Sequence, residues 1–178
     1  MNTADIFASA TTTGTDAHAT TTGTDAHALT AGYSAHATTT GDYSRASTAG
    51  YYAHATTAGD YAYATTAGND AHASTAGYYA HATTAGDYAY ATTTGNDAHA
   101  TTTGQRAHAS VSGENAIAVA VGANSYARAA NGGFIVLAQY DGDTVVAIKT
   151  AQAGRDGIKP DTWYKLSPTG EFVEAEVE

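Results

Sequence analysis

Glycine recurs at a strict nine-residue interval along about two thirds of this 178-residue chain. Around each glycine the sequence repeats approximately T-T-(T/A)-G-x-x-A-(H/Y)-A, without an insertion or a deletion. The series runs through Gly14, Gly23, Gly32, Gly41, Gly50, Gly59, Gly68, Gly77, Gly86, Gly95, Gly104, Gly113 and Gly122. A fixed short period of this kind is typical of a solenoid, in which each repeat stacks on its neighbours.

Small and larger residues alternate within each repeat. The third, fifth and seventh positions after the glycine are mostly Ala, Ala and Thr, whereas the fourth and sixth vary among His, Tyr, Arg, Thr, Ser, Leu and Val. A two-residue period predicts a strand with Ala and Thr facing inward and His or Tyr facing outward. We therefore predict an all-β fold, a parallel β-solenoid (β-helix or β-roll) of nine-residue repeats with a turn after each strand.

Two internal periods leave the number of strands per coil open. Residues 48–73 match residues 75–100 at a spacing of 27, which would correspond to three strands per coil. Residues 30–46 match residues 48–64 closely at a spacing of 18, which would correspond to two. We favour two strands, because small inward side chains suit a narrow, flattened core. Structural roles follow for the corner glycines and for core alanines, including Gly50, Gly59, Gly68, Gly77, Gly86, Ala62 and Ala64.

Both ends of the chain depart from the repeat. Residues 1–10, with Ile6 and Phe7, are predicted to form an N-terminal cap, and the thirteen repeats occupy residues 11–127. Residues 128–178 are predicted to form a C-terminal β capping domain, because an open solenoid end exposes strand edges and core.

Two β-hairpins are predicted within the C-terminal capping domain. The first joins GFIVLAQY to TVVAIKT through a turn at Asp141-Gly142-Asp143. The second joins residues 163–166 to residues 171–173 across residues 167–170, and it gives Trp163 a structural role.

Composition narrows the classes of function. The chain has 17 acidic and 7 basic residues, a net charge of −10, which argues against direct nucleic-acid binding through a basic face and suits basic partners. The absence of cysteine excludes disulfides, thiol nucleophiles and Cys-based metal sites. The first ten residues lack the features of a signal peptide and no run is apolar enough to span a bilayer, so we expect a cytoplasmic protein without membrane contact. No motif predicts a catalytic site or a cofactor.

All eight histidines occupy the same repeat position. In a two-sided coil, His18, His36, His54 and His72 would form a ladder with neighbours about 4.8 Å apart. Imidazoles so placed could share Zn²⁺, Ni²⁺ or Cu²⁺, or could respond to pH. Because Tyr, Arg and Ile interrupt the column and no fixed carboxylate supports it, we prefer an exposed stacking ladder.

Two further resemblances to ligand-binding solenoids are weak. The turn aspartates have the period of the calcium-binding nonapeptide, but each repeat has one glycine and the carboxylate position varies. Outward T-x-T pairs resemble ice-binding β-solenoids, yet Ala, Ser and Leu29 interrupt the columns. Turn formation and β-propensity explain these residues adequately.

Tyrosine is the other enriched residue type, and we predict that the turn tyrosines lie along one rim. Exposed tyrosine beside His and Asp is typical of recognition surfaces. The candidates for a partner surface are Tyr51, Tyr52, Tyr61, Tyr63, Tyr78, Tyr79, Tyr88, Tyr90, His54 and His81. The alternative is that these rings stack within the ladder and only stiffen the rod.

Two A-G-D-Y-A segments, residues 58–62 and 85–89, and the C-terminal sequence of residues 133–174 (GFIVLAQYDGD…GIKPDTWYKL…GEFVE) carry a resemblance to known sequences. The chain resembles nonapeptide-repeat proteins of phage and bacterial genomes, and the C-terminal part is the more specific portion. The resemblance covers most of the chain. It implies a phage or prophage origin without an established activity.

These observations lead to three hypotheses of function. The first is a non-catalytic scaffold that binds a macromolecular partner. Such a scaffold would be an acidic phage-encoded protein that occupies a host factor in the host cytoplasm, and its negative charge would imitate that of a nucleic acid. The second is a structural rod or virion fibre segment, assembled from copies of the chain end to end or side to side. The third is a metal or ligand surface on the His/Tyr ladder.

Overall fold

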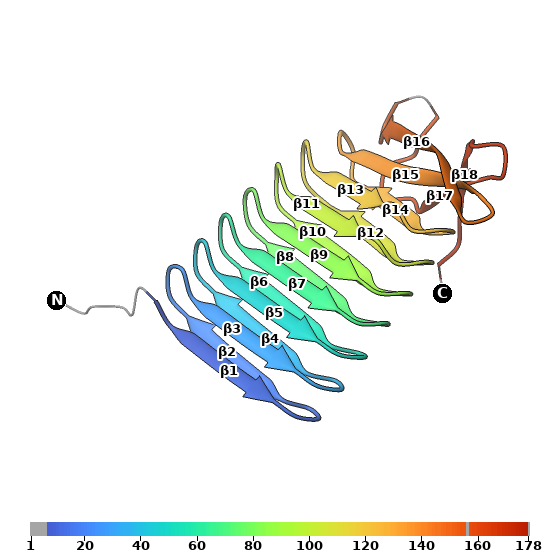
Figure 1. Cartoon of the computed structure of the whole chain (residues 1–178). Coiled ribbons are helices and arrows are strands. Elements are labelled where there is room, and N and C mark those ends of the chain that lie inside the picture. Colours follow the sequence, from blue (N-terminus) through green and yellow to red (C-terminus); the bar gives the residue numbers. More distant parts are fainter. Residues whose placement is uncertain (1–6, 156, 178) are drawn as a thin grey trace.

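The computed structural model describes residues 7–155 and 157–177, and within these residues the chain forms eighteen β-strands and no helix. Two sheets of nine strands each run along a flattened solenoid (Figure 1). Sheet A contains β1 (Ser9–Thr13), β3 (His27–Ala31), β5 (Arg45–Ala49), β7 (Tyr63–Ala67), β9 (His81–Ala85), β11 (His99–Thr102), β13 (Ile117–Ala120), β15 (Phe134–Asp141) and β16 (Thr144–Gln152). Sheet B contains β2 (His18–Thr22), β4 (His36–Thr40), β6 (His54–Ala58), β8 (His72–Ala76), β10 (Tyr90–Thr94), β12 (His108–Val111), β14 (Tyr126–Ala129), β17 (Tyr164–Leu166) and β18 (Phe172–Glu174).

Each coil contains two strands, one in each sheet. Successive strands of a sheet pair in parallel with partners 18 residues apart, as His18 with His36 and Ala19 with Ala37. The predicted β-solenoid is therefore confirmed, together with the preferred two strands per coil. The 27-residue match does not correspond to a coil.

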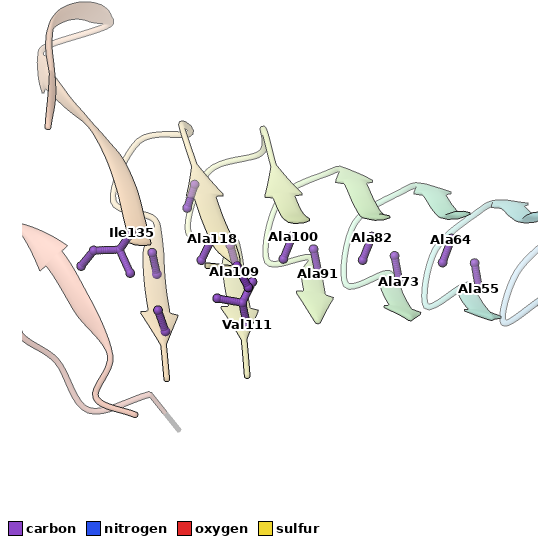
Figure 2. Close-up of a cluster of buried hydrophobic side chains, with 14 of the residues drawn as sticks. Ala55, Ala64, Ala73, Ala82, Ala91, Ala100, Ala109, Val111, Ala118 and Ile135 are labelled. Carbon is purple, nitrogen blue, oxygen red and sulfur yellow. The ribbon is translucent and has the colours of Figure 1, made fainter. Parts of the chain in front are cut away.

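The core is a thin layer of alanine and threonine between the two sheets. Burial alternates along β7, where Ala64 and Thr66 are 1% exposed and their neighbours point outward. Figure 2 shows Ala55, Ala64, Ala73, Ala82, Ala91 and Ala100 directed into the space between the strands. The inward and outward faces predicted from the two-residue period are confirmed, and Ala62 is also fully buried.

Glycine is required at the corners because successive coils approach one another closely there. A Cβ atom added to Gly50, Gly59, Gly68, Gly77 or Gly86 would overlap the carbonyl oxygen of the glycine one coil earlier. The left-handed helical conformation occurs two residues later, at non-glycine residues such as Asp16, with φ of 53°. The repeat glycine and the left-handed residue thus have different roles within one turn.

Parallel pairing continues beyond residue 127. The first half of β15 pairs in parallel with β13, and the offset between Ile117 and Phe134 is 17 residues, one fewer than in the preceding coils.

Of the expected N-terminal cap, residues 1–6 lie outside the described residues, while Ser9 and Ala10 begin β1 and Phe7 is 77% exposed.

Antiparallel strands follow the last coil, and both predicted hairpins are present. β15 pairs with β16 through a two-residue loop at Gly142-Asp143, so Asp141 belongs to the strand, and Gly142 has the positive φ of 58° that this loop requires. β17 pairs with β18. Larger side chains fill this end of the core, among them Ile135, Leu137, Ile158 and Tyr164. Trp163 is only half-buried; it packs on the outer face of sheet B.

Substitutions at two glycines distinguish two reasons for glycine at the corners: the close approach of neighbouring coils and the positive φ angle. In Gly104→Ala the new Cβ would overlap the Gly86 carbonyl although Gly104 has no left-handed φ, whereas Gly14→Ala meets no atom within 4 Å but has a φ of +134°. We expect Gly104→Ala to cost about 3 kcal/mol through steric overlap and Gly14→Ala about 1 kcal/mol through backbone strain. Urea unfolding followed by circular dichroism measures both, and equal losses would contradict the proposed role of the close approach.

Candidate functional site

The outward histidines and tyrosines form one column on each sheet. On sheet B the column starts every strand and contains His18, His36, His54, His72, Tyr90, His108 and Tyr126. On sheet A it contains Ser9, His27, Arg45, Tyr63, His81, His99, Ile117 and Phe134. Seven residues of the two columns are not histidine, and four of them, Arg45, Tyr63, Tyr90 and Tyr126, contact the ring of a neighbour in the same column. Tyrosine and arginine also offer flat faces, so these four continue the stack.

The first four histidines of sheet B stack face to face. Their ring centroids are 4.7–4.8 Å apart, with interplanar angles of 2–10°. Equivalent nitrogens of parallel rings are separated by about the same distance, whereas two nitrogens on one zinc ion lie at most about 4.2 Å apart. No group of three or more potential metal-ligating side chains occurs in residues 7–155 and 157–177. In this arrangement the ladder His18, His36, His54 and His72 is suited to stacking rather than to shared metal coordination.

Stacking favours uncharged imidazoles. Burial, followed by the neighbouring His72 and His36, lowers the pKa of His54 below its usual value of 6.5. Burial also lowers the pKa of His72, against the opposing effect of Asp70, and lowers that of His81, which has His99 as its neighbour. A neutral stack avoids the repulsion that adjacent imidazolium ions would experience.

The turns form two rims, one on each side of the sheets, and this corrects the prediction of a single tyrosine rim. Rim 1 consists of the turns that follow the strands of sheet A, and rim 2 of the turns that follow the strands of sheet B. The predicted partner residues Tyr51, Tyr52 and Tyr88 lie on rim 1, together with Tyr33, whereas Tyr61, Tyr78 and Tyr79 lie on rim 2, together with Tyr43. The remaining candidates lie on the sheet faces: Tyr63 and His81 on sheet A, Tyr90 and His54 on sheet B.

Rim 2 combines tyrosines with carboxylates. Tyr43, Tyr61 and Tyr79 stack in parallel with centroids 5.1 and 5.2 Å apart, and they are 51%, 41% and 45% exposed. The turns of this rim also carry five carboxylates and no lysine or arginine: Asp25, Asp42, Asp60, Asp97 and Glu114. Rim 2 therefore unites a stacked phenol column with a row of negative charge.

Backbone hydrogen bonds hold two of these carboxylates in place. Oδ1 of Asp42 accepts a hydrogen bond from the backbone N–H of Asp60 at 3.0 Å, and Oδ1 of Asp60 accepts one from Tyr78 at 2.9 Å. The neutral Asn96 makes the same contact with Glu114 one coil further along. Aspartate or asparagine directly after the glycine thus links successive coils through a hydrogen bond to the backbone. This structural role was not predicted when the turn aspartates were compared with calcium-binding repeats.

The outward threonines do not form an extended array. On sheet B, one column contains only hydroxyl-bearing residues from Thr20 to Ser110, but the adjacent column changes from Thr40 to Ala58 and Ala76. Paired T-x-T columns on this sheet therefore occupy neighbouring strands only at β2 and β4. This arrangement gives little support to ice binding.

An apolar patch at the C-terminal end of sheet A was missed. Ile117 and Val119 align with Phe134 and Val136 on the outer face, and Ile148 of β16 aligns with Ala138. Phe134 is 37% and Ile148 is 53% exposed, and the far edge of β16 pairs with no strand of the described residues. The alternation of Ile117, Val119 and Val121 with alanine was the sequence signal for this patch.

Acidification should destabilise the fold through His108, which is 7% exposed. Burial, with a smaller contribution from His72, lowers the pKa of His108 from 6.5 to about 4. In the unfolded chain His108 becomes protonated as the pH falls through about 6.5, whereas in the folded chain it stays neutral until near pH 4. The free energy of unfolding is therefore highest above pH 6.5 and decreases as the pH falls toward 4. The expected loss is roughly 3 kcal/mol.

Urea unfolding at pH 7 and at pH 4.5 measures this loss. His108→Tyr introduces the residue type that the same column has at Tyr90 and Tyr126. This variant should show a smaller difference in the free energy of unfolding between pH 7 and pH 4.5. His27→Tyr on sheet A controls for the addition of a tyrosine to a column. An unchanged difference in His108→Tyr would show that His108 is not responsible.

Comparison with known proteins gives no further assignment. No protein-family model, curated protein or solved structure matches this chain. Among the described residues, no helical segment has the length and apolar character needed to cross a membrane.

Proposed function

We propose that this protein is a non-catalytic recognition scaffold whose rim 2 binds a basic surface on a protein partner. The observation that carries the proposal is the stacked column of Tyr43, Tyr61 and Tyr79 beside carboxylates on an edge without a lysine or arginine. Tyrosine supplies rigid contact area at low entropic cost, and fixed carboxylates supply charge complementarity. No cofactor is required for this role.

The row of negative charge on rim 2 has the sign, though not the density, of a nucleic-acid strand. Its five carboxylates are distributed over six successive coils about 4.8 Å apart, whereas one strand of a DNA duplex presents a phosphate about every 3.4 Å. The net charge of −10 adds long-range attraction toward a basic surface. A phage-encoded protein of this kind would occupy a host factor in the host cytoplasm and imitate the charge of a duplex.

Isosteric variants test the role of charge on rim 2. Asp42→Asn and Asp60→Asn keep the Oδ1 acceptors that cap the next coil, as Asn96 shows, but remove two charges. We expect immobilised wild-type protein to retain a stoichiometric partner from a bacterial lysate, and duplex DNA to displace it. The double variant should retain several-fold less, because two charge contacts are lost.

The matched control removes two charges from rim 1 by Asp16→Asn and Asp70→Asn, and it should retain the partner fully. Tyr61→Asn offers a second test, since asparagine tolerates the left-handed φ of 57° but removes the phenol. Equal retention by all variants, or a partner that DNA does not displace, would contradict the assignment to rim 2.

The apolar end patch of Ile117, Val119, Phe134, Val136 and Ile148 favours self-assembly as a second candidate. An edge strand with exposed apolar side chains can pair with the same strand of a second copy. Two copies of β16 in antiparallel order would satisfy each other's free backbone groups. This contact would produce a dimer or, with a second contact, a rod or fibre segment.

Light scattering coupled to size-exclusion chromatography tests the second candidate. We expect the wild-type protein to dimerise with increasing concentration and Ile148→Lys to remain monomeric, because an edge lysine opposes strand pairing. Ala85→Lys, at an exposed outward position of sheet A in β9, is the matched control and should dimerise like the wild type. A wild-type protein that stays monomeric at all concentrations would exclude this candidate.

A further inference from the structure

A groove of about 520 Å³ lies where the last coils of sheet B meet the C-terminal segment. Tyr90, His108 and Tyr126 contribute from β10, β12 and β14, Arg106 contributes from rim 1, and Lys165 contributes from β17. The volume falls within the usual range for small-molecule sites. This groove is separate from rim 2, and its role does not depend on the proposed function.

Positive charge is concentrated at this groove in an otherwise acidic protein. Arg106 and Lys165 line it, opposed by the carboxylate of Glu176. Arg128 lies nearby; its guanidinium carbon is 4.9 Å from the ring centroid of Trp163, and it donates hydrogen bonds to the hydroxyl of Ser110. Three of the seven basic residues of the chain thus gather at the end of sheet B.

His108 differs from the other histidines of its column. Its ring meets those of Tyr90 and Tyr126 at interplanar angles of 83° and 77°, whereas the earlier histidines of sheet B stack in parallel. The side chain is 7% exposed, yet its Nδ1 atom is buried without a hydrogen-bond partner among the described residues. A buried polar atom without a partner costs free energy, and because solvent does not reach Nδ1, a ligand in the groove would contact other atoms of this lining.

The groove offers polar atoms rather than free aromatic faces. Tyr90 is stacked on His72 on one side and meets His108 on the other, and the Lys165 ammonium lies 6.0 Å from the centroid of Tyr126. The hydroxyls of Tyr90 and Tyr126 make no hydrogen bond within the described residues. Such a lining favours a ligand with many hydroxyl groups over a nucleobase, which would require an uncovered ring face.

We propose that this groove binds a sugar that carries a carboxylate or phosphate group. Arg106 and Lys165 hold the anionic group through charge-assisted hydrogen bonds. The phenol hydroxyls of Tyr90 and Tyr126 bond to the sugar hydroxyls. A phenol hydroxyl can serve as donor or acceptor, as sugar hydroxyls require.

The single tryptophan of the chain provides the readout, because the ring of Trp163 lies 5.4 Å from that of His108. The 178-residue chain is titrated with glucuronate, N-acetylneuraminate and glucose 6-phosphate, which separate carboxylated from phosphorylated sugars. Glucose, inorganic phosphate and the uncharged nucleoside adenosine serve as comparison ligands. We expect a saturable change in tryptophan fluorescence with at least one of the three anionic sugars, and weaker or no binding of glucose and inorganic phosphate.

Charge variants locate the site. Lys165→Met and Arg106→Gln should each weaken binding of the active sugar about tenfold, because each removes a charge-assisted hydrogen bond. Arg155→Gln removes the same charge from an exposed position outside the groove and should bind like the wild type. Isothermal titration calorimetry repeats the measurement if a variant alters the fluorescence of Trp163 itself. The proposal is overturned if no anionic sugar saturates the wild type, if adenosine or inorganic phosphate binds equally well, or if Arg155→Gln weakens binding as much as Lys165→Met.

Discussion

The close approach of successive coils at the glycine corners is the constraint on which the rest of the structure depends. The corner glycines from Gly41 to Gly122 lie directly against the carbonyl of the glycine 18 residues earlier, so no side chain fits between them. The coils up to β14 therefore stack in 18-residue register, and each strand position there lies above its equivalent in the coil before. Because alanine and threonine fill the core, backbone hydrogen bonds between coils carry much of the stability.

Exact stacking places like side chains next to each other, and the protein avoids the resulting repulsion in two ways. The partly buried His54, His72 and His81 have lowered pKa values, which favours the neutral form of these three rings. On rim 2, Asp42 and Asp60 each direct one carboxylate oxygen to a backbone N–H of the next coil. The register between coils brings like charges close together, but it also places a backbone N–H donor beside each of these two carboxylates, and this hydrogen bond stabilises the charge.

The nine-residue period and the alternation within it were sufficient to predict the fold and the core, because these depend on local pattern alone. The histidine ladder followed from the favoured two strands per coil. The same choice places Tyr61 and Tyr88 on different edges, but the two rims were not predicted. The groove at His108 could not be predicted either, because it depends on where β17 and Trp163 pack against sheet B. The alternation of Ile117 and Val119 with alanine was visible in the sequence, but their alignment with Phe134 and Val136 depends on how β15 pairs with β13.

The tyrosines of rim 2 support a role in recognition through their backbone conformation. Tyr43, Tyr61 and Tyr79 have φ values of 60°, 57° and 53°, in the left-handed region that asparagine, aspartate and glycine tolerate better. The equivalent residues Asp25, Asp97 and Asn115 on the same rim show that the turn forms with such residues. Each tyrosine there costs on the order of 1 kcal/mol relative to glycine, which stacking at 5.1–5.2 Å offsets in part. Tyr52 and Tyr88 on rim 1 have the same conformation, so what distinguishes rim 2 is that its three strained tyrosines occupy adjacent coils and stack, and the proposed contact with a partner would give this arrangement a reason.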